Sequence, residues 1–290
     1  KAQVLLSRRK VEELANLPDL TDARLSAAVA IIEALFAPAY FMDPKLFFWL
    51  IHQCLFISLA HGNAPASSVG YVSYGLLLSA AMGKHAPAEE FGRLGLRLAE
   101  RYRWIERRAK LNTMFGLFIH HFRDHARTSI EYAQKSVGYG VESGDLIYAC
   151  YAAANYAECT AIVGDSLDEV KREAERGRRF SAPLRHHDVD VMFLLLEQFV
   201  RALRGETDGP ASMSSHDVDE ASLLSDVKSA EARIMLAIYL IWKIQLSFLF
   251  QRPEQAMELA FEYDALIEDM TAGQLRMTEY AFYTCLSTIA

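Results

Sequence analysis

PASSVGYVSYGLLLSAAMGKHAPAEEFGRLGLRLAERYRW, residues 65–104, decides the fold that we expect for this chain. Apolar or small residues recur at helical spacing in both halves of the stretch: Val69, Val72, Leu76 and Ala80, then Phe91, Leu94, Leu98 and Tyr102. Gly83 can end the first helix, and Pro87 fits the first turn of the second. Small residues would let the two helices approach closely: Gly75, Ala80, Ala88, Gly92 and Gly95. The stretch predicts an antiparallel helical hairpin without a catalytic motif.

Similar patterns predict helices along the rest of the chain. Thr21 or Asp22 can cap a helix that ends at Ala37-Pro38, and Asp43-Pro44 opens the next one. The expected helices are Val4–Leu17, Ala23–Phe36, Lys45–His61, Glu106–Phe122, Ala126–Glu142, Asp145–Val163, Ser166–Phe180, Leu184–Leu203, Val227–Phe250, Glu254–Met270 and one from about Thr271. No alternating stretch is long enough to predict a strand.

The turns between the helices of successive hairpins recur at a nearly constant interval. They fall at Gly83, Asp124, Gly164, Gly205 and Arg252, so their positions differ by 41, 40, 41 and 47 residues. This regularity predicts an all-α fold, a tetratricopeptide-like α-solenoid of antiparallel helical hairpins, with repeats longer than the usual unit of about 34 residues. The last interval is longer because residues 206–226 form an insertion rich in Ser, Asp and Gly, which we expect to be mobile.

Composition excludes several broad classes. A net charge of −7 and a pI near 5.7 argue against a general nucleic-acid binder. The four cysteines form no CxxC pair, which predicts reduced thiols in the cytoplasm. The apolar runs Leu46–Ala60 and Ile234–Phe250 are too short and too polar for membrane spans, so we expect buried helices. Because the chain begins with Lys1 and stops within a helical pattern, we expect a piece of a longer protein.

Histidines are the first candidates for chemistry. His121 and His125 stand four residues apart, a spacing that suits two metal ligands on one helix, but Asp124-His125 falls at an expected turn. The run His186-His187-Asp188 resembles the dyad of metal-dependent phosphohydrolases, yet no distant histidine and aspartate complete it. Acidic residues at a helix N-terminus explain that run better. We therefore predict no metal site.

Phosphate and cofactor motifs also fail their structural context. Gly83-Lys84 lacks the preceding glycine of a phosphate loop, and Gly138-Tyr139-Gly140 follows a helix rather than a strand. Asp217–Glu220 lacks the glycine and the final glutamate of a calcium loop. The sequence predicts no catalytic residue and no cofactor.

Two surfaces are candidates for binding. Arg93, Arg97 and Arg101 form an i, i+4 stripe that is either a solvated face or a docking face for an acidic segment. A second basic cluster has the same two interpretations, with the solvated face favoured: Lys171, Arg172, Arg176, Arg178 and Arg179.

The concave surface of a solenoid is its usual binding site, and the first helices of its hairpins usually line it. Aromatic and amide residues that we place there include Tyr71, Tyr74, Asn112 and Tyr156. Most such residues are expected to pack in the core. The predicted recognition strip is Tyr148, Tyr151, Asn155 and Glu158, of which the last three share a helical face.

Residues 17–47, LPDLTDARLSAAVAIIEALFAPAYFMDPKLF, and residues 57–79, ISLAHGNAPASSVGYVSYGLLLS, resemble the helical region of very large signalling proteins of bacteria and fungi. Those proteins join a serine/threonine-kinase-like domain, a STAND-type ATPase, a tetratricopeptide-like array, a GAF sensor and often a histidine kinase. Leu20 replaces the family's methionine, and His61 and Ala64 replace a tyrosine and a serine. Residues 144–170 resemble the family's next hairpins, and the resemblance weakens beyond Asp208.

The resemblance implies a regulatory role without catalytic residues of its own. The matching positions are expected to be caps and turns: Asp22, Pro38, Asp43, Pro44, Gly62, Asn63 and Pro65. The family's kinase, ATPase and phosphoacceptor motifs lie outside the matched segment. Residues 1–44 would lead from an upstream ATPase, and residues 45–290 would form the array. The parent protein would be an ATP-dependent kinase, and by analogy the array would receive an inducer or partner.

Three hypotheses follow. The first is a non-catalytic cytoplasmic scaffold that binds other domains of its parent, or a partner protein or peptide, in a concave groove. The second is a small-molecule sensor with a pocket inside the superhelix, and the third is a metal-dependent hydrolase. An open groove lined by aromatic and basic side chains favours the scaffold, and a closed apolar pocket with a few polar groups favours the sensor.

Overall fold

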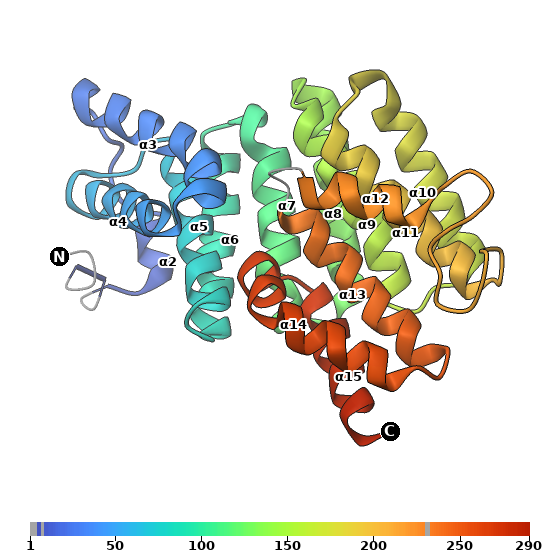
Figure 1. The fold of residues 1–290 in the computed structure, drawn as a ribbon. Helices are drawn as coiled ribbons and strands as arrows, with labels where there is room; N and C mark the ends of the chain where they lie inside the picture. Colours follow the sequence, from blue (N-terminus) through green and yellow to red (C-terminus); the bar gives the residue numbers. More distant parts are fainter. Residues whose placement is uncertain (1–4, 7–8, 230–232) are drawn as a thin grey trace. The chain divides into compact units, whose positions relative to one another are not determined.

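The computed structural model describes residues 5–6, 9–229 and 233–290 (Figure 1). Within these ranges the regular secondary structure is helical, as predicted, and pairing of the β type is confined to two isolated bridges. The chain divides into two compact units, Lys1–Ala149 and Cys150–Ala290. The division that the sequence suggests between residues 44 and 45 stays a prediction.

In the first unit, consecutive helices pack together in pairs: α3 with α4, α5 with α6, and α7 with α8. Helices α4 and α5, and α6 and α7, also contact one another, so successive pairs share a core. The helices are α2 (Val11–Leu14), α3 (Ala23–Met42), α4 (Pro44–His61), α5 (Ser67–Ala80), α6 (His85–Arg101), α7 (Arg108–Phe118), α8 (Ala126–Ser143) and the start of α9 (Leu146–Ile162), with short 3₁₀ turns at Ile105–Arg107 and His120–Phe122.

The hairpin of α5 and α6 confirms the interpretation of residues 65–104. Gly83 has a φ of 61°, the left-handed conformation that ends a helix most easily at glycine. Helix α6 begins at His85, so Pro87 lies in its first turn. The two helices approach so closely at Gly95 that an added Cβ would lie 2.5 Å from the carbonyl oxygen of Ser68. The small residues of this stretch therefore set the spacing of the helices.

Replacement of Gly95 by alanine should lower the free energy of unfolding by about 1–3 kcal/mol, because the new methyl group would lie 2.5 Å from both the Ser68 carbonyl oxygen and the Cγ2 atom of Val72. Gly138→Ala is the matched control, since a Cβ there meets nothing within 4 Å in helix α8. It should leave stability unchanged or raise it by up to about 1 kcal/mol. Urea titrations followed by circular dichroism measure both effects. Equal stability of the two variants would contradict the close approach.

Helix α3 differs from its prediction. The sequence placed a break at Ala37-Pro38, but the helix continues through Pro38 to Met42. A proline inside a helix costs roughly 3 kcal/mol. Packing beyond the proline compensates, because Ala39 is buried and the ring of Tyr40 lies 5.4 Å from that of Phe47. Asp43 then caps α4 by accepting hydrogen bonds from two backbone N–H groups, as the Asp43-Pro44 signal predicts.

Helix α3 also bears on membrane association. Its segment Ala23–Tyr40 is the one candidate in the described ranges that is long and apolar enough to cross a membrane. Buried core helices of soluble proteins and signal sequences near an N-terminus meet the same criteria, and 22% of this segment is buried. The cytoplasmic location stays a prediction. The two runs expected to be buried form α4 and α13 (Arg233–Leu249), and both contribute many residues to the core.

The N-terminal segment is anchored at Asn63. The Asn63 side chain accepts a hydrogen bond from the Tyr71 hydroxyl at 3.0 Å and donates one to the Leu14 carbonyl at 2.8 Å. Its backbone N–H donates to the carbonyl of Pro18 at 2.8 Å. The predicted helix Val4–Leu17 is longer than α2, and its residues 4 and 7–8 lie outside the described ranges.

In the part that the structure describes, the second unit holds the rest of α9 and six further helices. Helices α10 and α11 pack together, and α13 contacts α11, α12, α14 and α15. The helices are α10 (Leu167–Ser181), α11 (His187–Leu203), α12 (Glu220–Ser229), α13, α14 (Pro253–Thr271) and α15 (Arg276–Ile289), with a 3₁₀ turn at Ala182–Leu184.

The predicted insertion, residues 206–226, contains regular structure that its composition did not suggest. Its C-terminal part begins helix α12. The single helix expected at Val227–Phe250 includes residues 230–232, which lie outside the described ranges, so its continuity stays a prediction. Side chains tie the insertion to the core: Arg201 bonds to Asp217 at 2.6 Å, and Lys243 bonds to Glu220 at 2.5 Å. Its mobility stays a prediction.

All four cysteines are free thiols. Cys54, Cys150 and Cys159 are buried, and Cys285 is exposed. Burial raises the pKa of Cys54 and of Cys159 to about 12, and it also raises the pKa of Cys150. The three buried thiols are therefore protonated and poorly nucleophilic at neutral pH.

Candidate functional site

Half of the predicted recognition strip is buried, and its residues Tyr148 and Tyr151 are partly exposed. Asn155 and Glu158 are buried, and Arg276 of α15 covers both, with its guanidinium 2.6 Å from Glu158 and 3.3 Å from the Asn155 oxygen. The ring of Tyr151 lies 5.2 Å from that of His186, and burial raises the Tyr151 pKa to about 12. Tyr148 belongs to the first unit, where the Lys110 ammonium lies 5.8 Å from its ring. Three of the four residues therefore have intramolecular partners in the second unit, and the binding role stays a prediction.

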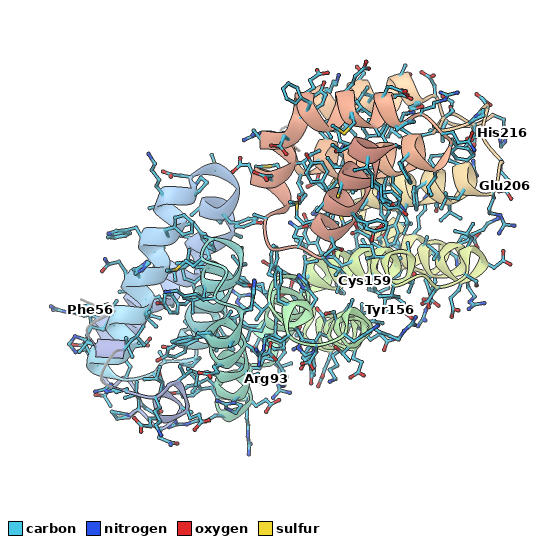
Figure 2. All side chains as sticks on the ribbon, turned by 90° about the horizontal axis from the view of Figure 1, so that it is seen from below. Phe56, Arg93, Tyr156, Cys159, Glu206 and His216 are labelled. Atoms are coloured by element: carbon cyan, nitrogen blue, oxygen red, sulfur yellow. The ribbon has the colours of Figure 1, made fainter. Side chains whose placement is uncertain are left out.

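The three arginines of the predicted docking face have different surroundings (Figure 2 labels Arg93). Arg101 is bound to the N-terminal segment, since it donates to the Asp19 carboxylate at 2.9 Å and to the Ala15 carbonyl at 2.6 Å. Arg93 and Arg97 instead line a cavity. Of the three predicted docking residues, Arg101 therefore makes a structural contact, and Arg93 and Arg97 belong to a candidate site.

This cavity has a volume of about 360 Å³ and lies among α6, α7 and α8. Its wall carries four cationic side chains, Arg93, Arg97, Arg108 and Lys135, against one carboxylate, Glu100. Tyr132, Tyr139 and Asn112 supply aromatic and amide surface. We call it the basic pocket. It combines the charge of an anion site with the aromatic and basic lining that the scaffold hypothesis expects.

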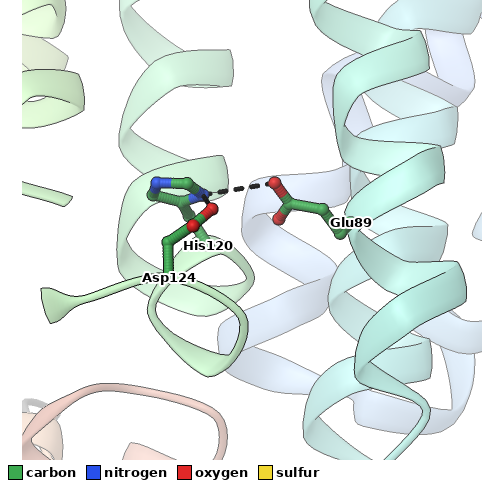
Figure 3. A group of neighbouring side chains, drawn as sticks. All are labelled: Glu89, His120 and Asp124. Atoms are coloured by element: carbon green, nitrogen blue, oxygen red, sulfur yellow. Dashed lines mark hydrogen bonds and ion pairs between the residues drawn. The ribbon is translucent and has the colours of Figure 1, made fainter. Parts of the chain in front are cut away.

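A cluster of ionisable groups lies beside Arg93 and is made of Glu89, His120 and Asp124, the three side chains that Figure 3 shows. The Nδ1 atom of His120 lies 3.2 Å from Glu89 and 3.4 Å from Asp124, and Arg93 forms an ion pair with Glu89 at 2.6 Å. The Nε2 atom of His120 lies 2.9 Å from the Thr128 hydroxyl.

The same cluster offers three possible metal-ligand atoms within 4.8 Å of one another. However, the guanidinium of Arg93 already neutralises the buried carboxylate of Glu89. A divalent ion would have to displace it. The arrangement therefore positions Arg93 better than it holds a metal.

The histidine pair considered for a metal is separated, as the predicted turn requires. His125 caps α8 and accepts from the Arg127 N–H at 3.1 Å, whereas both ring nitrogens of His121 are buried. The pKa of His121 is lowered to about 4, mainly by burial; a hydrogen bond with the Gly116 backbone opposes this shift, and the neighbouring His120 and His85 contribute to it. The run at His186 forms the N-terminus of α11, with acidic residues in its first turn, as expected.

The second basic cluster has the ion pairs of a solvated face. Arg172, Arg176 and Arg179 each pair with a glutamate one turn away on α10, at 3.1, 3.5 and 3.7 Å. Arg178 reaches Glu197 of α11 at 2.6 Å. These ion pairs agree with the solvated face that the sequence favoured, and docking of an acidic segment stays a prediction.

Sequence reasoning found Arg93, Arg97 and Asn112 but missed the other half of the basic pocket. Tyr132, Lys135 and Tyr139 recur at intervals of three and four on α8, which is the signal of one helix face. Nothing in the sequence indicates that this face meets Arg97 of α6 or Arg108 of α7, because helix packing brings them together.

Comparison with known proteins gives a limited result. No protein-family model matches the chain. The chain is 22% identical over 188 residues to "Hybrid signal transduction histidine kinase G" of Dictyostelium discoideum. This similarity covers 64% of the chain and spans 5% of the length of that protein. The chain thus has a weak homologue among signal transduction histidine kinases, which suggests a signalling role.

Proposed function

We propose that this chain is a non-catalytic regulatory segment of a multidomain signal-transduction protein, which binds protein segments or an inducer through a tetratricopeptide-like stack of helical hairpins. The parent protein would be an ATP-dependent kinase of the cytoplasm. The observation that supports this proposal most is the series of helix pairs in the first unit, where each pair packs on the next. Such stacking leaves an extended surface for a partner.

The weak similarity to a histidine kinase supports the same role. Because it spans only 5% of that much longer protein, the similarity is compatible with an array placed between output domains. This placement agrees with the resemblance of residues 17–47 and 57–79 to the helical region of large signalling proteins.

A sensor for a small molecule is the second candidate, and the volume of the basic pocket, rather than its lining, is the observation that favours it. Its volume of about 360 Å³ falls within the range of small-molecule sites, about 300–1,000 Å³. In this form of the proposal, ligand binding among α6, α7 and α8 changes how the hairpins pack.

A thermal-shift screen of the purified chain tests both forms. The scaffold predicts that peptides from the rest of the parent protein raise the melting temperature, and the sensor predicts that a metabolite does so. A ligand at 100 times its dissociation constant stabilises the folded state by about 2.7 kcal/mol, which corresponds to several degrees. No response to either set would refute the proposal. Stoichiometric metal together with hydrolysis of a phosphate ester would support the third hypothesis, a hydrolase.

A further inference from the structure

We propose that the basic pocket binds a small organic anion that carries phosphate groups. The inference rests on the sensor form of the proposed function and names the chemical class of its ligand. The evidence comes from the charge of the pocket, from the contacts that hold its cations, and from one buried donor.

Three of the four cations that line the pocket have no carboxylate partner among the described residues. Arg93 pairs with Glu89, but Arg97, Arg108 and Lys135 form no ion pair within the described ranges. Glu100 is the only carboxylate of the lining. Since the whole chain carries a net charge of −7, this concentration of positive charge is local. A pocket of this kind attracts an anion with more than one negative charge.

Aromatic rings hold these cations in place before any ligand arrives. The Arg108 guanidinium lies 5.5 Å from the centre of the Tyr139 ring, and the Lys135 ammonium lies 5.1 Å from that of Tyr132. Arg93 lies 5.7 Å from the centre of the Phe115 ring. Cation–π contacts at these distances are favourable. They reduce the side-chain entropy that a ligand would otherwise have to overcome.

One donor of the pocket is already removed from water without a partner. The Nε atom of Arg108 is buried and makes no hydrogen bond within the described residues. A buried donor without an acceptor costs free energy that a ligand oxygen would recover. The nearby Asn112 amide donates its own N–H to the backbone carbonyl of Arg108 at 2.8 Å.

Phosphate fits these groups better than a single carboxylate. Guanidinium groups bind phosphate oxygens with two parallel hydrogen bonds, and the pocket offers three of them. A phosphate monoester carries about −1.5 to −2 charges at neutral pH, whereas a carboxylate carries one. The volume of about 360 Å³ suits a metabolite rather than a polymer.

The test is calorimetric titration of the full chain with inorganic pyrophosphate, alongside thermal shift. The double variant R97Q/K135Q removes two exposed cations that make no ion pair in the described part of the chain. Arg172→Gln is the matched control, because Arg172 is exposed and lies on α10, outside the pocket. We expect saturable binding to the wild type and to the control, and at least a tenfold loss of affinity in the double variant. Circular dichroism checks that all variants fold.

Three outcomes would overturn the proposal. The first is absence of saturable binding, and the second is equal affinity in R97Q/K135Q and R172Q. The third is a preference for citrate over pyrophosphate at the same ionic strength, which would assign the pocket to carboxylates. If a phosphoserine peptide binds and pyrophosphate does not, the small-molecule pocket fails while the scaffold form of the proposed function stands. If pyrophosphate binds and no parent-derived peptide does, the sensor form stands.

Discussion

Replacement of Glu33 by alanine is expected to lower the free energy of unfolding by about 3–5 kcal/mol, one of the two largest effects that the structure predicts. Glu33 on α3 is 3% exposed and lies 2.8 Å from the ammonium of Lys110 on α7, which is also buried. Arg107 approaches the same carboxylate at 3.3 Å. Without Glu33, the Lys110 charge stays buried with no opposite charge beside it. Urea unfolding at neutral pH measures the loss.

The double variant E33L/K110M provides the control. Replacing both members of a buried ion pair by apolar residues of similar volume is often neutral or stabilising, because neither charge then has to leave water. Arg107 is 36% exposed at its side chain and stays solvated. We expect the double variant to recover most of the stability that E33A loses. If E33A unfolds at the wild-type urea concentration, the pair does not hold α3 to α7.

A second large effect should appear as a function of pH. Burial lowers the pKa of His121 from 6.5 to about 4, so the folded protein binds fewer protons there than the unfolded chain does between these values. Stability therefore rises with pH across this window and is lost as the pH falls from 6.5 towards 4. A shift of this size corresponds to a loss on the order of 3 kcal/mol.

His121→Gln tests this effect, because glutamine stays neutral at every pH. Its stability should depend less on pH between 4 and 6.5 than that of the wild type. The same substitution at His216, whose side chain is 88% exposed, is the control and should change the dependence less than His121→Gln does. Denaturant titrations at several pH values give the slopes. Parallel curves for wild type and His121→Gln would contradict the burial of a neutral imidazole.

Caps and turn residues in the sequence predicted the helix ends well where helix packing favours the same ends. Gly83 and Pro87 mark a turn that the structure places between α5 and α6. Asp22 caps α3 through hydrogen bonds from the N–H groups of Arg24 and Leu25, as one of the two predicted caps. In each case the end of a helix is determined by a residue within a few positions of it, so the sequence alone is enough to predict where the helix begins or ends.

Predictions failed where distant contacts outweigh a local preference. Pro38 should end a helix, but the packing of α3 on α4 and the ring of Phe118, 6.2 Å from Tyr40, stabilise the turns around it. The polar composition of residues 206–226 did not suggest α12, which contacts α13. The basic pocket needs three helices at once, and no local pattern shows which faces meet.

The distribution of thiols makes the molecule convenient for spectroscopy. Cys285 is exposed near the end of α15, while the other three sulfur atoms are buried with raised pKa values. A maleimide dye should therefore attach at one position of the native chain without any prior mutagenesis. The fluorescence of a dye at that position would report conformational changes of α15, including any that break the ion pair between Arg276 and Glu158.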